Sequence, residues 1–143
     1  MPDIRPLNDR FAVAPQIDPA DLPAIAAAGY VAIVNNRPDD EQLGQPSGDA
    51  IRAAAEAAGL AYHAVPVTHA GIAQAQLDAM AAALTAADGP VLAFCRSGTR
   101  SCHLWALAAA RAGRDPALLV TQGEGAGYDL AGLRPTLDTL AGR

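Results

Sequence analysis

Residues 91–101 read Val-Leu-Ala-Phe-Cys-Arg-Ser-Gly-Thr-Arg-Ser. The apolar run 91–94 has the composition of a short strand covered by helices on both faces of a parallel sheet. Six polar residues follow it, and residues 101–112 predict a long helix that ends at Gly113. The stretch therefore predicts a strand–loop–helix unit. Its loop should wrap backbone N–H groups around one point, at the positive end of the helix dipole, and so form an anion-binding nest.

The rest of the chain alternates short apolar runs with alanine-rich amphipathic segments. Strands are expected at 11–14, 30–34 and 62–67, and helices are expected to start at Pro19 and to cover 48–58, 73–86 and 130–140. Strands separated by helices of this length favour right-handed crossovers. The sequence thus predicts an α/β fold with a central, mostly parallel sheet of four to five strands, flanked by helices on both faces. One domain is expected over residues 1–143.

Composition narrows the classes of protein that the chain can belong to. The chain has 143 residues, of which 51% are hydrophobic and 17% charged, a balance typical of a globular domain. A net charge of −5 argues against nucleic-acid binding, which needs a basic surface. No apolar run approaches the roughly 20 residues that span a bilayer, and the polar N-terminus does not look like a signal peptide. A cytoplasmic protein without a membrane or nucleic-acid partner is expected.

Three loops should meet at the carboxyl edge of the sheet, where α/β proteins bind ligands: residues 35–41, 68–71 and 95–100. Cys95 lies at the base of the nest. The N–H donors, the helix dipole and Arg100 should favour its thiolate form, which is a nucleophile. A purely structural buried cysteine is the alternative, but packing alone does not explain two arginines, two serines and a glycine directly after the thiol.

The spacing within the loop separates two kinds of chemistry. Cys-x-x-Gly-x-x-Arg, with five residues between cysteine and arginine, is the phosphate loop of cysteine-dependent protein phosphatases. Cys-Arg-x-Gly-x-Arg, with four, is the loop of rhodanese-type sulfurtransferases. This chain has the shorter form, from Cys95 to Arg100, with Gly98 in the shared position. A ring that is one residue shorter should enclose a smaller volume, which favours one extra sulfur atom over a tetrahedral phosphate.

Beyond the loop, the chain resembles the beta-lactamase hydrolase-like protein, phosphatase-like domain family. The matching stretches are 16–17, 35–41, 46–47, 59–62, 66–67, 89–92, 104–106 and 126–130. The resemblance implies a dual-specificity-phosphatase-type fold and an activity often described as sulfur transfer. It also implies a sulfur-oxidation setting, with a persulfide-oxidising metalloenzyme as a partner.

The leading hypothesis is therefore a rhodanese-type sulfurtransferase. Cys95 would take sulfane sulfur from thiosulfate or a persulfide, become a persulfide and pass the sulfur to a thiol acceptor, without a cofactor or metal. The alternative is a cysteine-dependent phosphatase that works through a phosphocysteine intermediate, and a third interpretation is a non-catalytic anion sensor. The predicted site residues are catalytic Cys95 and Arg100, anion-binding Arg96, Ser97, Gly98, Thr99, Ser101 and Arg37, and auxiliary His69 and Asp40.

A phosphatase of this type needs a proton donor for the leaving oxygen, yet residues 65–71 contain no carboxylate. His69 could serve as the acid or be an exposed loop residue. The acids at 39–41 could reach the site or form a solvated turn. Arg37 could form a structural ion pair with those acids or bind an anionic sulfur donor such as thiosulfate.

Two further features remain open in the sequence. Cys102 could form a disulfide with Cys95 or simply pack against the sheet. The glycine-rich segment 123–128 does not follow a strand, so it lacks the context of a dinucleotide-binding motif. A flexible loop beside the active site is expected there.

Overall fold

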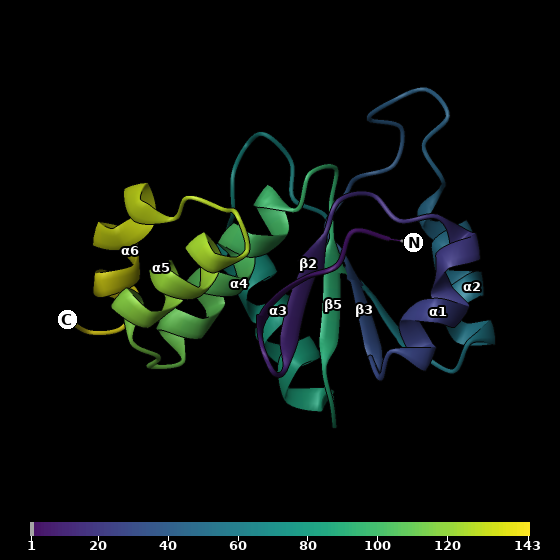
Figure 1. Ribbon diagram of the computed structural model, residues 1–143. Helices are drawn as coiled ribbons and strands as arrows, with labels where there is room; N and C mark the ends of the chain where they lie inside the picture. Colours follow the sequence, from purple (N-terminus) through teal and green to yellow (C-terminus); the bar gives the residue numbers. More distant parts are fainter. Residues whose placement is uncertain (1) are drawn as a thin grey trace.

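The computed structural model describes residues 2–143, which form one five-stranded sheet with helices on both sides (Figure 1). The strands are β1 (Arg5–Asn8), β2 (Phe11–Ala14), β3 (Ala32–Asn35), β4 (Ala61–Ala64) and β5 (Val91–Phe94). The helices are η1 (Pro19–Asp21), α1 (Leu22–Ala27), α2 (Gly48–Ala57), α3 (Gln74–Ala86), α4 (Thr99–Arg111), α5 (Pro116–Gly125), η2 (Ala131–Leu133) and α6 (Arg134–Leu140). Within the described part of the chain, no helix has both the length and the apolar character needed to cross a membrane.

The strand order is β1-β2-β5-β3-β4, and all neighbouring pairs except β1–β2 are parallel. Phe94, the last residue of β5, is paired with Ala14 on one side and Asn35 on the other. The carboxyl ends of the three central strands therefore lie level at one edge of the sheet, with β5 in the middle. The predicted α/β class and the mostly parallel sheet are confirmed.

Alternating side chains of the strands divide the core into two layers, as the two-residue period of a strand requires. The layer beneath α1 and α2 contains Ala12, Ala14, Ile33, Leu92 and Phe94. The opposite layer, beneath α3 to α6, contains Phe11, Val13, Val34, Val91 and Ala93. Figure 1 shows the same division, with α1 and α2 on one side of the strands and α4, α5 and α6 on the other. Both faces of the central strands are therefore buried, which explains their continuous apolar runs.

Several elements differ from the sequence-based expectation. β1 was not expected, because it contains Pro6 and proline is rare in strands. An antiparallel edge strand such as β1 nevertheless tolerates a proline. The helix after the cysteine loop begins at Thr99, two residues earlier than expected. The expected loop at 123–128 is partly helical, since α5 extends to Gly125. Position 123 of this helix favours glycine, because the Cβ of any other residue would lie 2.9 Å from Cγ of Leu130.

Candidate active site

Three segments that leave the carboxyl edge of the sheet meet around Arg100, which lies in the first turn of α4. The carboxylate of Glu41, from the loop after β3, accepts hydrogen bonds from both terminal nitrogens of Arg100. The carbonyl oxygen of Val67, from the segment after β4, accepts a third at 2.7 Å. The segments after β3, β4 and β5 are therefore tied together by one guanidinium group.

Cys95 is fully buried and follows directly after β5. Its Sγ accepts a hydrogen bond of 3.1 Å from the backbone N–H of Gly98, so the loop curls back over the sulfur. Gly98 has a φ of +92°, a conformation that glycine adopts without strain. It also occupies the N-cap of α4 and offers no side-chain cap. The N–H of Thr99 donates to the Ser97 hydroxyl at 3.3 Å, whereas those of Arg100 and Ser101 have no acceptor among residues 2–143 and are available to an anion that approaches the sulfur.

The guanidinium of Arg100 is held at one edge and open at the other. Its NH1 and NH2 lie 2.7 and 2.8 Å from the two carboxylate oxygens of Glu41. Among residues 2–143, no oxygen atom accepts a hydrogen bond from Nε, so the edge formed by Nε and NH2 faces at most the nearby thiol of Cys95. The hydrogen bond to Glu41 is the main reason that the pKa of Arg100 is raised, and the nearby Cys95 contributes as well. A fixed guanidinium beside the sulfur, with a free edge, is suited to holding an oxyanion.

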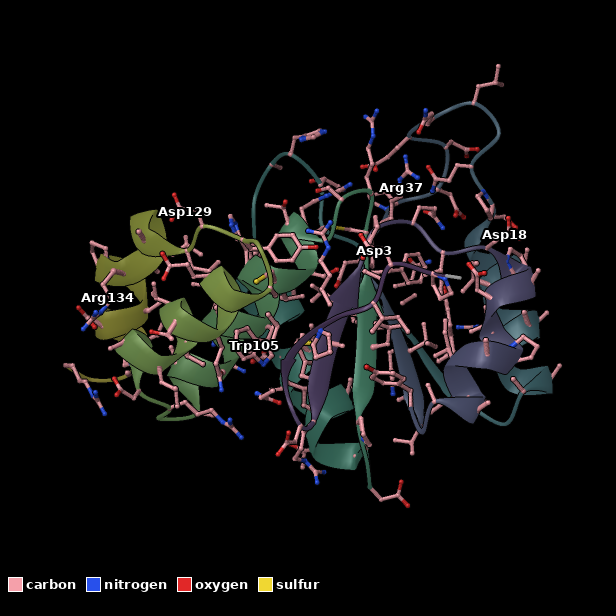
Figure 2. All side chains as sticks on the ribbon, in the orientation of Figure 1. Asp3, Asp18, Arg37, Trp105, Asp129 and Arg134 are labelled. Carbon is pink, nitrogen blue, oxygen red and sulfur yellow. The ribbon has the colours of Figure 1, made fainter. Side chains whose placement is uncertain are left out.

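Arg37 also binds Glu41, through the oxygen that NH2 of Arg100 contacts. Nε of Arg37 lies 3.0 Å from Oε1 of Glu41, and its two terminal nitrogens donate to Gln16 and Gln42. Its side chain is only 2% exposed. Figure 2 shows Arg37 beyond the carboxyl ends of the strands. Of the two interpretations of Arg37, the contacts match the latch that pairs with a neighbouring acid, since each end of the guanidinium already binds a protein oxygen.

The acids at 39–41 and His69 are the side chains that the sequence offers as proton donors. The pKa of Glu41 is lowered to about 2, chiefly by the hydrogen bond from Arg100, so its carboxylate is ionised near neutral pH. Asp39 accepts the backbone N–H of Gly48 at the start of α2, and Asp40 is exposed with a φ of +62°. His69 is exposed in the turn after β4. Within residues 2–143, neither Asp39, Asp40 nor His69 has a recorded hydrogen bond to the cysteine loop.

The remaining predicted loop residues line its rim or its interior. Arg96, Ser97 and Thr99 are exposed, and the Ser97 hydroxyl donates to that of Thr99 at 3.0 Å. Ser101 is buried one residue after Arg100, and its hydroxyl has no partner among residues 2–143. The rim is therefore polar and open, while a free hydroxyl lies within the first turn of α4.

Tyr128 contacts the loop although sequence reasoning assigned it no role. Its hydroxyl donates to the carbonyl of Ser97 at 3.0 Å, and a Cβ at Gly98 would lie 2.8 Å from Cζ of its ring. The Arg5 guanidinium covers the ring at 5.4 Å from its centroid. Burial raises the pKa of Tyr128, so the hydroxyl keeps the proton that it donates. The only signal in the sequence is the neighbouring glycine-rich segment, which is expected to pack beside the active site.

Replacing Tyr128 with phenylalanine should remove this hydrogen bond and keep the ring packing. We expect a loss of about 1 kcal/mol in the free energy of unfolding and a fall of roughly three- to tenfold in kcat. Chemical denaturation and steady-state kinetics measure the two effects. Tyr30→Phe is the matched control, because within residues 2–143 its hydroxyl has no recorded hydrogen bond, and it should change neither value. An unchanged kcat in Tyr128→Phe would show that catalysis does not depend on the hydrogen bond from Tyr128 to the cysteine loop.

Cys102 is buried in the core layer beneath α3 to α6. Burial, with a smaller contribution from the nearby Cys95, raises the pKa of its thiol to about 12. A thiol with this pKa is poorly suited to thiol–disulfide exchange at neutral pH. The contacts therefore favour packing over the disulfide alternative.

Replacing Cys102 with alanine should then leave turnover within about twofold of the parent and cost about 1 kcal/mol of stability through the lost packing. The check is a rate measurement under oxidising and reducing conditions. If Cys102 instead formed a disulfide with oxidised Cys95, the variant would accumulate oxidised Cys95. It would then lose activity under oxidising conditions only.

Comparisons with known proteins show which sequences and folds this chain resembles. A beta-lactamase hydrolase-like protein of Xylella fastidiosa (strain Temecula1) is 42% identical over 108 residues, which make up 76% of this chain. The chain spans only a quarter of that relative's length. A solved structure from Neisseria meningitidis Z2491, described as a candidate phosphatase, matches with a TM-score of 0.82 and 33% identity. That match covers 96% of this chain and 98% of the other.

A third similarity extends only to the fold. The structure of Tk-PTP in its active form matches with a TM-score of 0.73 at 17% identity, over 99% of this chain and 97% of that one. The family model described as beta-lactamase hydrolase-like protein, phosphatase-like domain, matches residues 3–112, a range that includes the sheet and the whole cysteine loop. The chain, with its phosphatase-like fold, therefore belongs to the beta-lactamase hydrolase-like protein, phosphatase-like domain family.

Proposed function

We propose that Cys95 is the nucleophile of a phosphomonoester hydrolase that acts on small esters with good leaving groups. The observation that carries this proposal is the cysteine loop, in which the sulfur accepts the N–H of Gly98 and Arg100, nearby, is fixed by Glu41. Similarity over nearly the whole chain to a protein described as a candidate phosphatase supports the same reaction. Phosphate hydrolysis, the alternative in the sequence, thus takes precedence over sulfur transfer.

The reaction proceeds in two balanced steps. The thiolate of Cys95 attacks phosphorus, the S–P bond forms, and the P–O bond to the alcohol breaks, so the alkoxide or aryloxide leaves with the bonding electrons. Water then attacks phosphorus, the S–P bond breaks, and inorganic phosphate and the thiolate are released. In both steps the first-turn N–H groups of α4 and the open edge of Arg100 stabilise the charge on the oxygens that remain bound to phosphorus.

The leaving group decides which esters react. Glu41 is held as a carboxylate by Arg37 and Arg100, so it has no proton to give near neutral pH. Without a neighbouring acid, the departing oxygen must leave as an anion, and general acid catalysis of about 10²- to 10⁴-fold is forgone. We therefore expect turnover of 4-nitrophenyl phosphate and much slower turnover of glycerol phosphate.

Sulfur transfer is the second candidate, and it is favoured by the same lack of a proton donor and by the four-residue spacing of the loop. In that reaction the Cys95 thiolate attacks the sulfane sulfur of thiosulfate, and sulfite leaves with the electron pair of the broken S–S bond. An acceptor thiolate then attacks the outer sulfur of the persulfide and restores the Cys95 thiolate. Sulfite is a good leaving group and needs no acid.

Intact-mass measurement separates the two reactions. Protein quenched in acid during turnover of 4-nitrophenyl phosphate should gain about 80 mass units as phosphocysteine. A persulfide formed from thiosulfate would instead add about 32. A phosphoryl adduct with release of phosphate supports the first proposal. A stable sulfur adduct without phosphoryl transfer would replace phosphate hydrolysis with sulfur transfer. If no adduct formed in either experiment, the result would favour a non-catalytic anion sensor.

A further inference from the structure

A cavity lies at the amino edge of the sheet, away from Cys95. It has a volume of about 230 Å³ and lies between β2, β5, α3 and α4. Val91, the first residue of β5, contributes to its wall, whereas Cys95 follows the last residue of the same strand. A strand rises about 3.3 Å per residue, so roughly 13 Å of strand separates the two positions. The cavity and the cysteine loop are therefore distinct sites.

The inner wall of the cavity is aromatic and rigid. Phe11 and Trp105 line it, and their rings stack with centroids 5.6 Å apart and an angle of 7° between the planes. Trp105 is only 3% exposed, and Figure 2 shows it between α4 and the strands. Leu84 of α3 forms part of the facing wall. A ligand entering this cavity would meet a preformed apolar surface, which keeps the ordering cost of binding low.

The same cavity is lined by two arginines and no acid. Arg10 and Arg114 are exposed, and among residues 2–143 neither has a recorded ion pair. Their guanidinium groups are thus available to an external anion, unlike that of Arg37, whose three nitrogens already donate to Glu41, Gln16 and Gln42. A positive rim around an apolar interior complements a molecule with an anionic head and an apolar body.

We propose that this cavity binds a small carboxylate with an apolar body, such as a medium-chain fatty acid or an aryl-substituted short-chain acid. The carboxylate would pair with Arg10 and Arg114, and the apolar body would pack against Trp105. A cavity of about 150 Å³ already accommodates benzene, so about 230 Å³ has room for a ring with a short side chain or a chain of about eight carbons. Inorganic phosphate and thiosulfate lack the apolar part and should not bind here.

Trp105 is the only tryptophan of the chain, so its fluorescence reports directly on the cavity. Titration with octanoate should give a saturable change in emission, and calorimetry should give the same Kd. Octylamine, which has the same chain length and the opposite charge, should cause no saturable change. Cys95→Ser should bind octanoate as the parent does, which separates this site from the active site.

Two kinds of variant test the assignment. The double variant Arg10→Gln with Arg114→Gln should weaken octanoate binding by about tenfold or more, while Arg134→Gln, which removes an arginine of α6, should not. Ala81→Leu should fill the cavity and abolish binding, provided that circular dichroism shows an intact fold. Equal binding of octylamine, parent-like affinity in the double variant, or parent-like affinity in a folded Ala81→Leu would each overturn the proposal.

Discussion

Cys95→Ser is expected to lower turnover of 4-nitrophenyl phosphate by about 10⁴-fold or more, because a serine hydroxyl in this loop has no base to ionise it. Serine is close to cysteine in size, and the N–H of Gly98 can still donate to its oxygen. The fold and the anion-binding nest should therefore persist. Initial rates with the aryl phosphate, and thiocyanate release from thiosulfate and cyanide, measure the loss in both candidate reactions.

The matched control for this substitution is Cys102→Ala, which removes the other thiol of the chain and should leave turnover intact. Orthophosphate or vanadate binding to Cys95→Ser should also remain measurable, since the donors of the loop are unchanged. Substantial turnover by Cys95→Ser would remove the thiol from the mechanism and leave both proposed reactions without a nucleophile.

Glu41→Gln is expected to have the second largest effect, because one carboxylate holds two arginines. An amide retains one oxygen acceptor and turns an NH₂ group toward a guanidinium, so Arg100 loses its two-point anchor, and buried Arg37 loses the negative charge that it faces. We expect kcat/KM to fall by about 10²-fold and stability to fall by about 2 kcal/mol. Kinetics and urea denaturation measure the two losses.

A surface ion pair provides the control for that loss. Asp78 pairs with Arg111 at 2.7 Å, but its side chain is 62% exposed. Asp78→Asn should therefore cost less than about 1 kcal/mol and leave turnover unchanged. If Glu41→Gln behaved like Asp78→Asn, the three-residue network would be a surface feature without a role in positioning Arg100.

The same network predicts how stability depends on pH. The pKa of Glu41 lies at about 2 in the folded protein, against 4.5 as its ordinary value. Between these values the unfolded chain binds more protons than the folded one, so stability rises with pH. The contribution of Glu41 to the free energy of unfolding is fully present above pH 4.5 and is lost as the pH falls toward 2. Urea midpoints measured across this window should fall more steeply for the parent than for Glu41→Gln.

The volume argument for sulfur transfer remains a prediction. It rests on the four residues between Cys95 and Arg100, whereas the similarity to a candidate phosphatase favours phosphate chemistry. The open edge of Arg100 and the free N–H groups suit the oxygens of either phosphate or thiosulfate. The adduct that forms on Cys95 decides between them.

Local pattern was sufficient to predict the α/β class, the mostly parallel sheet and the strand–loop–helix unit around Cys95. An apolar run of four residues, a glycine in the loop and the period of a helix are properties of neighbouring residues, so they can be read along the chain. The family was also evident, since its motifs are contiguous stretches. β1 escaped prediction because its pairing with β2 compensates for a residue composition that is poor for a strand.

The contacts that complete the site depended on tertiary structure. Glu41 and Arg100 are 59 residues apart, and Tyr128 lies 31 residues from Ser97. Sequence alone singled out Asp40 among the acids at 39–41, whereas the fold turns Asp39 toward α2 and Glu41 toward the two arginines. Periodicity specifies which face of an element is buried, but a hydrogen bond between loops depends on where several crossovers bring the chain back to one edge of the sheet.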